Sequence, residues 1–140
     1  MIGKPDLLKW IYSIDKRMKS SITLVAVGGT AMTLLGLKPS TIDVDLCIAS
    51  KDKKDFEKLI GDKFKVDLFV DGFIFSEQLP SDYIQKSKDI LQLKNITLKA
   101  LSPLDIIITK AARLNARDEG DISLLAKYVK KEELIKRFNE

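Results

Sequence analysis

Residues 25–48 read VAVGGTAMTLLGLKPSTIDVDLCI, and the rest of the chain is best understood around this segment. The pattern predicts a strand ending at Gly28-Gly29, a short helix, a turn, and a second strand that carries Asp43 and Asp45. Because residues two apart in a strand point to the same side, the two carboxylates share one face. Neighbouring carboxylates repel each other and are costly to bury. A divalent cation between them would remove that cost, and Mg2+ prefers one or two carboxylates together with waters and substrate phosphates.

Two glycines at the end of the first strand belong to the same argument. A helix that begins at Gly28-Gly29 has backbone N–H groups without intrahelical partners in its first turn, where the helix dipole favours an anion. Glycine also lets a phosphate approach the backbone closely and adopts positive φ. We therefore expect Gly28, Gly29 and Thr30 to bind phosphate oxygens through backbone N–H groups and the Thr30 hydroxyl. The same geometry also makes a tight strand-to-helix turn.

The order apolar-Gly-Gly, short helix, Asp-apolar-Asp-apolar resembles the signature of the DNA polymerase β-type nucleotidyltransferase superfamily. Residues 27–29 (Val-Gly-Gly) and 43–46 (Asp-Val-Asp-Leu) fit that signature, and residues 30–42 form a spacer at the long end of its range. The segment is most similar to small stand-alone members, including AbiEii-like nucleotidyltransferases of toxin–antitoxin systems. The resemblance implies that Asp43 and Asp45 hold two Mg2+ ions, with Mn2+ as a substitute. The alternative is a pair of carboxylates that face solvent at the edge of a sheet.

A third carboxylate is expected on the strand predicted over residues 64–70. Asp67 lies between two apolar residues of this strand, where a structural acid has little reason to occur. The superfamily completes its metal site with an acidic residue on a neighbouring strand, and the resemblance assigns that role to Asp67. Asp71 is the competing candidate, but the sequence Asp71-Gly72 is typical of a turn.

The C-terminal segment LSPLDIIITKAARLNARDEGDISLL, residues 101–125, also resembles the small nucleotidyltransferases. Its helical spacing places Lys110, Arg113 and Arg117 in one basic stripe, which could contact a phosphate and stabilise the departing pyrophosphate. We therefore expect Lys110, Arg117 and Asp118 to contribute to nucleotide binding. The alternative is a solvated helix face with an ion pair, Arg117–Asp118 or Arg113–Asp121, between two helices. Asp121 could equally orient the lysine.

Composition narrows the chemistry that is open to this chain of 140 residues. The absence of histidine excludes Ser–His and Cys–His triads and His-ligated zinc sites, so transfer must use carboxylates, lysines and metal. The net charge of +4 favours a polyanionic partner such as a nucleotide or RNA, although a lysine-coated surface has the same balance. A single cysteine, Cys47, and the lack of a signal peptide or membrane-spanning run favour the cytoplasm.

Periodicity and turn residues predict one α/β (α+β) domain over residues 1–140, with a core of about 1–101 and a helical C-terminal part of about 102–140. The expected fold is a small mixed sheet flanked by helices. The aromatic residues Trp10, Phe56, Phe64, Phe69 and Tyr128 are assigned to its core. The expected helices cover residues 5–18, 30–35, 51–60, 82–86, 102–116, 118–128 and 132–138; strands cover 22–27, 64–70 and 73–75, and a hairpin covers 89–93 and 96–101.

The resulting hypothesis is a metal-dependent nucleotidyltransferase that moves a nucleoside monophosphate from an NTP to an acceptor hydroxyl and releases pyrophosphate. RNA, tRNA, a protein or a small molecule could be the acceptor, in a toxin–antitoxin system or elsewhere. The small size of the chain suggests a homodimer or a partner subunit that completes the site. Two alternatives are a catalytically silent nucleotide- or RNA-binding module of the same fold and a structural protein of unrelated α/β fold.

Overall fold

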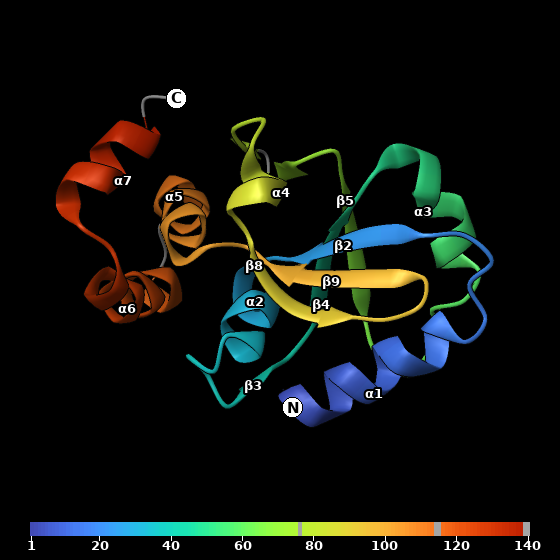
Figure 1. The fold of residues 1–140 in the computed structure, drawn as a ribbon. Coiled ribbons are helices and arrows are strands. Elements are labelled where there is room, and N and C mark those ends of the chain that lie inside the picture. Colours follow the sequence, from blue (N-terminus) through green and yellow to red (C-terminus); the bar gives the residue numbers. More distant parts are fainter. Residues whose placement is uncertain (76, 114–115, 139–140) are drawn as a thin grey trace.

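The computed structural model describes residues 1–75, 77–113 and 116–138, and the side chains of residues 111–120, 131, 134 and 138 are outside this description. Its centre is a five-stranded sheet with the strand order β5-β4-β2-β9-β8 (Figure 1). The strands are β2 (Ile22–Ala26), β4 (Val44–Ile48), β5 (Val66–Val70), β8 (Lys88–Gln92) and β9 (Ile96–Ala100). The expected strands and the expected hairpin are therefore present; β2, β5 and β9 are shorter than expected by one or two residues, and β8 is shifted by one residue with its length unchanged.

The sheet is mixed, as expected, and its strand directions bring distant residues to one edge. β2 runs parallel to β9 and antiparallel to β4, β4 runs parallel to β5, and β8 runs antiparallel to β9. As a result β2 and β9 end, and β4, β5 and β8 begin, at the same side of the sheet. We call this side the Gly28 edge, because the chain leaves β2 there at Gly28.

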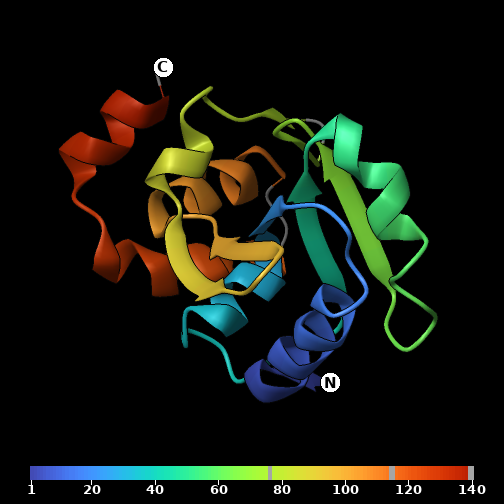
Figure 2. The same cartoon turned by 45° about the vertical axis from the view of Figure 1, so that its right-hand side comes forward.

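Two helices cover the sheet near β4 and β5. Helix α1 (Lys4–Asp15) passes below the sheet, and α3 (Ser50–Glu57) lies beside β5 (Figures 1 and 2). The ring of Trp10 meets those of Phe56 and Phe64 edge to face, with centroids 6.3 and 5.7 Å apart. Such contacts add to the area that three rings bury, so this cluster contains three of the five aromatic residues that the sequence assigns to the core.

Helix α1 is also tied to the β8–β9 hairpin through a buried carboxylate. Asp15 accepts hydrogen bonds of 2.8 Å from the backbone N–H groups of Asn95 and Ile96. The Asn95 side chain in turn donates to the carbonyl oxygens of Asp15 and Met18. A buried carboxylate that accepts two N–H groups replaces its lost hydration, so Asp15 joins two elements that are 80 residues apart.

The C-terminal helices gather at the opposite end of the molecule from α3 (Figure 1). They are α5 (Pro103–Arg113), α6 (Ala116–Leu125), the short 3-10 helix η1 (Ala126–Tyr128) and α7 (Lys131–Phe138). Ser102 caps α5 by accepting a hydrogen bond from the N–H group of Asp105, as the Ser-Pro sequence predicts. Within the described part of the chain, no helix is long and apolar enough to cross a membrane.

Shorter elements complete the fold. They are α2 (Gly28–Leu34), α4 (Tyr83–Lys86), and the two-residue strands β1 (Ile2–Gly3), β3 (Ser40–Thr41), β6 (Phe73–Ile74) and β7 (Glu77–Gln78), which pair as β1–β3 and β6–β7. Two sequence-based expectations are wrong. Asp43 lies in a bend before β4 and not in the strand, and Tyr128 is 60% exposed and not in the core.

Candidate active site at the Gly28 edge

The turn from β2 into α2 brings the backbone against a carboxylate. Gly28 has φ of +55°, a conformation that L side chains rarely adopt. A Cβ atom at Gly28 would lie 3.5 Å from Oδ2 of Asp45. The N–H group of Val27 donates to the carbonyl oxygen of Asp45 over 3.0 Å, which fixes the turn to β4. The glycine is therefore required by the backbone, and it places the start of α2 beside the Asp45 carboxylate.

Thr30 fixes the segment that carries the two aspartates. Its hydroxyl donates to the carbonyl oxygen of Asp43 over 3.0 Å and accepts from the N–H group of Asp45 over 2.9 Å. The hydroxyl of Thr41 donates to the same Asp43 oxygen over 3.0 Å. Thr30 is only 1% exposed, so its hydroxyl serves to position Asp43 and Asp45 and does not face a phosphate. Phosphate binding by the backbone N–H groups of Gly28, Gly29 and Thr30 stays a prediction.

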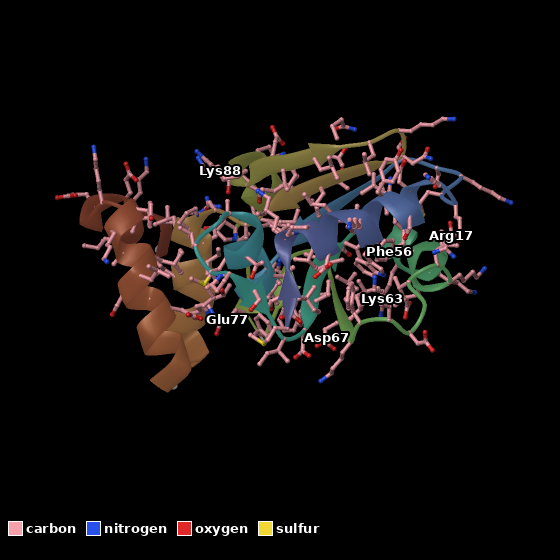
Figure 3. All side chains as sticks on the ribbon, turned by 90° about the horizontal axis from the view of Figure 1, so that it is seen from below. Arg17, Phe56, Lys63, Asp67, Glu77 and Lys88 are labelled. Carbon is pink, nitrogen blue, oxygen red and sulfur yellow. The ribbon has the colours of Figure 1, made fainter. Side chains whose placement is uncertain are left out.

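Asp45 and Asp67 are direct neighbours in the sheet. They are paired in the parallel register of β4 and β5, so their side chains leave the same face of strands about 4.8 Å apart. Asp45 is half-buried and Asp67 is exposed; Asp67 lies on the outer side of the molecule in Figure 3. Like charges at directly paired positions destabilise a sheet. The two carboxylates therefore repel each other, and a cation placed between them would reduce that repulsion.

Asp43 is half-buried in the bend that leads into β4. Among the side chains that the structure describes, no three His, Cys, Asp or Glu residues are close enough to hold a metal ion together. Mg2+ needs only one or two protein carboxylates when phosphates and waters supply its other ligands. The oxygen donors of Asp45 and Asp67 fit that requirement, and Asp43, two residues from Asp45, stays a predicted third donor.

An aromatic residue that the sequence reasoning missed lies over the glycine turn. Phe75 has φ of +49°, which is strained for a bulky residue. Its ring would lie 3.6 Å from a Cβ atom at Gly28. It also packs against the ring of Phe69, with centroids 4.7 Å apart at 58°. Phe69 is two residues beyond Asp67 in β5, so the two rings form an apolar wall on the carboxylate face of the strand.

The family of this chain follows from the comparison with known proteins. Residues 6–140 match the family described as "Nucleotidyltransferase of unknown function (DUF6036)". The chain belongs to this family. A comparison with curated protein sequences finds no match.

Two solved structures share the nucleotidyltransferase-like fold. The antibiotic-resistance factor ANT(2'')-Ia matches with a TM-score of 0.64 and 13% sequence identity, over 97% of this chain and 91% of that protein. TM1012 from Thermotoga maritima, a proposed nucleotidyltransferase, matches with a TM-score of 0.53 and 16% identity, over 91% of this chain and 94% of that protein. Together with the mixed sheet, these matches confirm the predicted fold class.

The predicted basic stripe of this nucleotidyltransferase family member is only partly described. Lys110 is 3% exposed, and its Nζ lies 2.9 Å from Oδ2 of Asp121, whose Oδ1 lies 2.6 Å from Nζ of Lys38. Burial alone would raise the pKa of Asp121, but hydrogen bonds from both lysines hold it below its usual value. Lys110 is thus oriented by Asp121, one of the arrangements that the sequence allowed. The side chains of Arg113, Arg117 and Asp118 lie outside the described residues.

Asp71, which directly follows β5, and Cys47, which lies in β4, both have structural partners. The carboxylate of Asp71 accepts from the N–H group of Ser50 over 3.0 Å at the start of α3. The thiol of Cys47 accepts from the N–H group of Gly72 over 3.2 Å and lies 3.3 Å from the hydroxyl of Tyr83. Burial raises the pKa of the Cys47 thiol, so little thiolate forms at neutral pH. These contacts favour Asp67 over Asp71 as the third acid and agree with a non-nucleophilic Cys47.

Proposed function

We propose that this protein is a metal-dependent nucleotidyltransferase that transfers a nucleoside monophosphate from an NTP to an acceptor hydroxyl. In this reaction the acceptor oxygen bonds to the α-phosphorus, the bond from that phosphorus to the β-phosphate oxygen breaks, and pyrophosphate leaves. The proton of the acceptor hydroxyl passes to a base. Mg2+, or Mn2+ in its place, would neutralise the phosphates and activate the acceptor oxygen, and two ions can stabilise both the attacking and the leaving oxygen.

One observation carries this proposal: Asp45 and Asp67 are paired in register beside the backbone of Gly28. Membership in a family of nucleotidyltransferases supports the same reading. Asp45 and Asp67 would hold the metal, with Asp43 as a further donor. Thr30 holds the backbone of Asp43 and Asp45 through its hydroxyl. Asp67, which is exposed, would accept the proton of the acceptor hydroxyl.

Phosphate binding would fall to the start of α2. The first N–H groups of a helix have no intrahelical partners and attract anions, and the glycines leave room for close approach. Because Lys110 is buried against Asp121, we assign it to the support of α5 and α6 and not to a direct phosphate contact. Pyrophosphate release, the identity of the NTP and a role in a toxin–antitoxin pair stay predictions.

The test is thermal unfolding of the purified protein with each of the four NTPs, with and without Mg2+. A ligand at about a hundred times its dissociation constant stabilises the folded state by about 2.7 kcal/mol, which gives a measurable shift in Tm. The native protein is compared with Asp45→Asn and with Asp89→Asn. Asp89 is a matched control because it is an exposed aspartate in β8, the edge strand at the other end of the sheet from β5.

We expect a Mg2+-dependent shift for at least one NTP in the native protein and in Asp89→Asn, and its loss in Asp45→Asn. Transfer of label from an α-phosphate-labelled NTP to RNA or protein should fall by more than about a hundredfold in Asp45→Asn, since loss of even an outer partner of a metal ligand costs about that much. A shift without label transfer in the native protein would identify a silent binding module. An unchanged shift in Asp45→Asn would overturn the site.

A further inference from the structure

A second polar feature lies at the Gly28 edge, beside β8, whereas the carboxylates lie beside β4 and β5 at the other end of the strand order. It is an open cavity of about 580 Å3 between β8, the start of α5, η1 and α7. We call it the lysine cavity, because Lys86, Lys88 and Lys136 line it from three different elements. All three lysines are exposed, so their ammonium groups can reach a bound anion.

The charge of the lysine cavity is positive after its internal ion pairs are considered. Arg137 also lines the cavity, but its guanidinium group donates to Asp105 over 2.7 and 2.8 Å and to Asp82 over 2.6 Å. These carboxylates balance the arginine. Of the described residues that line the cavity, Glu133 is the acidic one, against the three lysines Lys86, Lys88 and Lys136. The excess of cations attracts a ligand with more than one negative charge.

An exposed ring in the same cavity narrows the class of ligand. Tyr128 lines the lysine cavity and is 60% exposed. It belongs to η1, where no residue is buried, so the ring does not serve to fill the core. Lysines beside an open aromatic ring are the combination with which proteins bind single-stranded nucleic acids: cations contact phosphates and the ring stacks on a base. An acidic peptide would need the lysines but not the ring.

The sheet relates the lysine cavity to the candidate active site. Lys88 begins β8 and Asp45 lies at the start of β4, and both are at the Gly28 edge. Three strand spacings separate β4 from β8 in the order β4-β2-β9-β8, which amounts to about 14 Å. The paired register places the side chain of Lys88 on the face of the sheet that Ala100, Ala26 and Leu46 share, whereas Asp45 lies on the other face with Cys47. A strand must therefore pass around the Gly28 edge to join the lysine cavity to the carboxylates, which takes more than the roughly four stacked nucleotides, at ~3.4 Å each, that this span alone requires.

We propose that the lysine cavity binds a single-stranded nucleic acid and presents its terminal hydroxyl to the site at Asp45 and Asp67. Lys86, Lys88 and Lys136 contact phosphates, and Tyr128 stacks on a base. The assignment of this strand as the acceptor rests on the proposed function, whereas its binding does not. The sequence is compatible with a nucleic acid, a protein or a small molecule as acceptor, and the lysines and the exposed ring of the cavity favour a nucleic acid.

The test is the binding of fluorescein-labelled eight-nucleotide RNA and DNA strands, followed by fluorescence anisotropy as a function of salt. The native protein is compared with Lys86→Ala/Lys88→Ala/Lys136→Ala. Lys51→Ala/Lys54→Ala/Lys58→Ala is the control with the same change of charge, on exposed lysines in and after α3. Between 50 and 200 mM salt the native affinity should fall about twentyfold more than that of the cavity variant, because each lost phosphate contact removes about 0.7 from the salt slope. The control should retain the native slope.

Stacking is tested with Tyr128→Ala and Tyr128→Phe. We expect the alanine variant to bind about fivefold or more weakly and the phenylalanine variant to bind as the native protein does, because a base stacks on either ring. Tyr12→Ala is the matched control: Tyr12 is 50% exposed on α1, with Nζ of Lys16 4.8 Å from its ring centroid. The RNA and DNA strands show which sugar is preferred, and preference for either one supports the proposal.

Three results would overturn the proposal: no binding of either strand at low salt, equal losses in the cavity variant and the α3 control, or equal affinity for a glutamate peptide of matched charge. Its failure is distinguishable from that of the proposed function. The cavity variant should keep the Mg2+-dependent shift with NTP, and Asp45→Asn should keep the affinity for the strand.

Discussion

The charged residues of this protein are used in opposite ways at the Gly28 edge and among the C-terminal helices. In the C-terminal part, opposite charges meet: the side chain of Asp105 is fully buried against Arg137, whose side chain is 5% exposed, and Lys110 is buried against Asp121. In β4 and β5, like charges meet, because Asp45 and Asp67 are paired in register. The first arrangement holds helices together, whereas the second brings two charges that repel each other to paired positions.

Whether a charged side chain meets an opposite or a like charge distinguishes structural from functional residues more clearly than residue type does. A buried charge that has lost its water needs an opposite charge or hydrogen bonds, and the C-terminal pairs supply both within the chain. Two adjacent carboxylates on a strand gain nothing from each other. A ligand that brings positive charge would reduce this repulsion, and the proposed function therefore assigns the metal to Asp45 and Asp67 and not to Lys110.

The largest effect on stability is expected when the buried ion pair between Arg137 and Asp105 is removed. Arg137→Met leaves the Asp105 carboxylate buried without its guanidinium partner, and removal of one member of a buried pair costs about 3–5 kcal/mol. Urea unfolding of the native protein and the variant measures this loss. Asp105→Leu/Arg137→Met should recover most of it, since an apolar pair carries no unpaired charge. A loss below about 1 kcal/mol in the single variant would show that the pair behaves like a surface salt bridge.

A smaller effect is expected in acid from Asp121. Its pKa is lower in the folded protein than in the unfolded chain, because Lys38 and Lys110 outweigh its burial. The pairs therefore contribute fully above about pH 4, the unfolded value, and this contribution is lost as the pH falls through the folded value. The free energy of unfolding, measured from pH 7 downward, should decline more steeply in this window for the native protein than for Asp121→Asn.

At neutral pH, Asp121→Asn tests whether the charges of the C-terminal helices are structural and not part of the nucleotide site. Asp121→Asn should cost about 2 kcal/mol there, because two lysines lose a charged acceptor but keep the amide oxygen. The shift in Tm on addition of NTP with Mg2+ should not change. If Asp121→Asn keeps its stability but loses the shift in Tm with NTP and Mg2+, Lys110 is one of the phosphate-binding residues. The charges of the C-terminal helices would then be functional as well as structural.

Local patterns were enough to predict the elements of the sheet and the position of the glycine turn. Gly28-Gly29, the apolar run over residues 22–27 and the embedded Asp67 each act over a few residues, and the structure has β2, α2 and β5 at those places. The placement of Asp67 on a strand next to that of Asp45 was expected, but the register that pairs the two residues was beyond reach. Register depends on which strands become adjacent and how they align, and no local pattern contains that information.

Side-chain contacts between residues that are distant in sequence could not be predicted, because they form only in the folded chain. The sequence leaves Asp121 open between Arg113 and Lys110; the structure pairs it with Lys110 and also with Lys38, a partner far away in sequence that no local pattern indicates. Arg137 meets Asp105 across 32 residues. Tyr128 was assigned to the core because it is aromatic, and it is exposed because η1 buries none of its residues. Phe75 carried no signal, since a positive φ at a non-glycine residue cannot be read from residue type.

The smallest effect tests whether the carboxylate region stores backbone strain. Phe75→Ala and Phe75→Gly both remove the ring from Phe69 and Gly28, but only glycine relieves the positive φ of +49°. Because an L-residue in this conformation costs about 1–2 kcal/mol, the glycine variant should be more stable than the alanine variant by about 1 kcal/mol. Phe69, the ring that packs against Phe75, is the matched control in regular β5, where glycine should be the less stable choice by about 0.5–1 kcal/mol. Urea unfolding measures, at each of the two positions, the stability of the glycine variant minus that of the alanine variant. If this difference is positive at Phe75 and negative at Phe69, Phe75 is held in a strained backbone conformation, as expected of a residue that shapes a binding site. If the difference has the same sign at both positions, the two rings are ordinary packing.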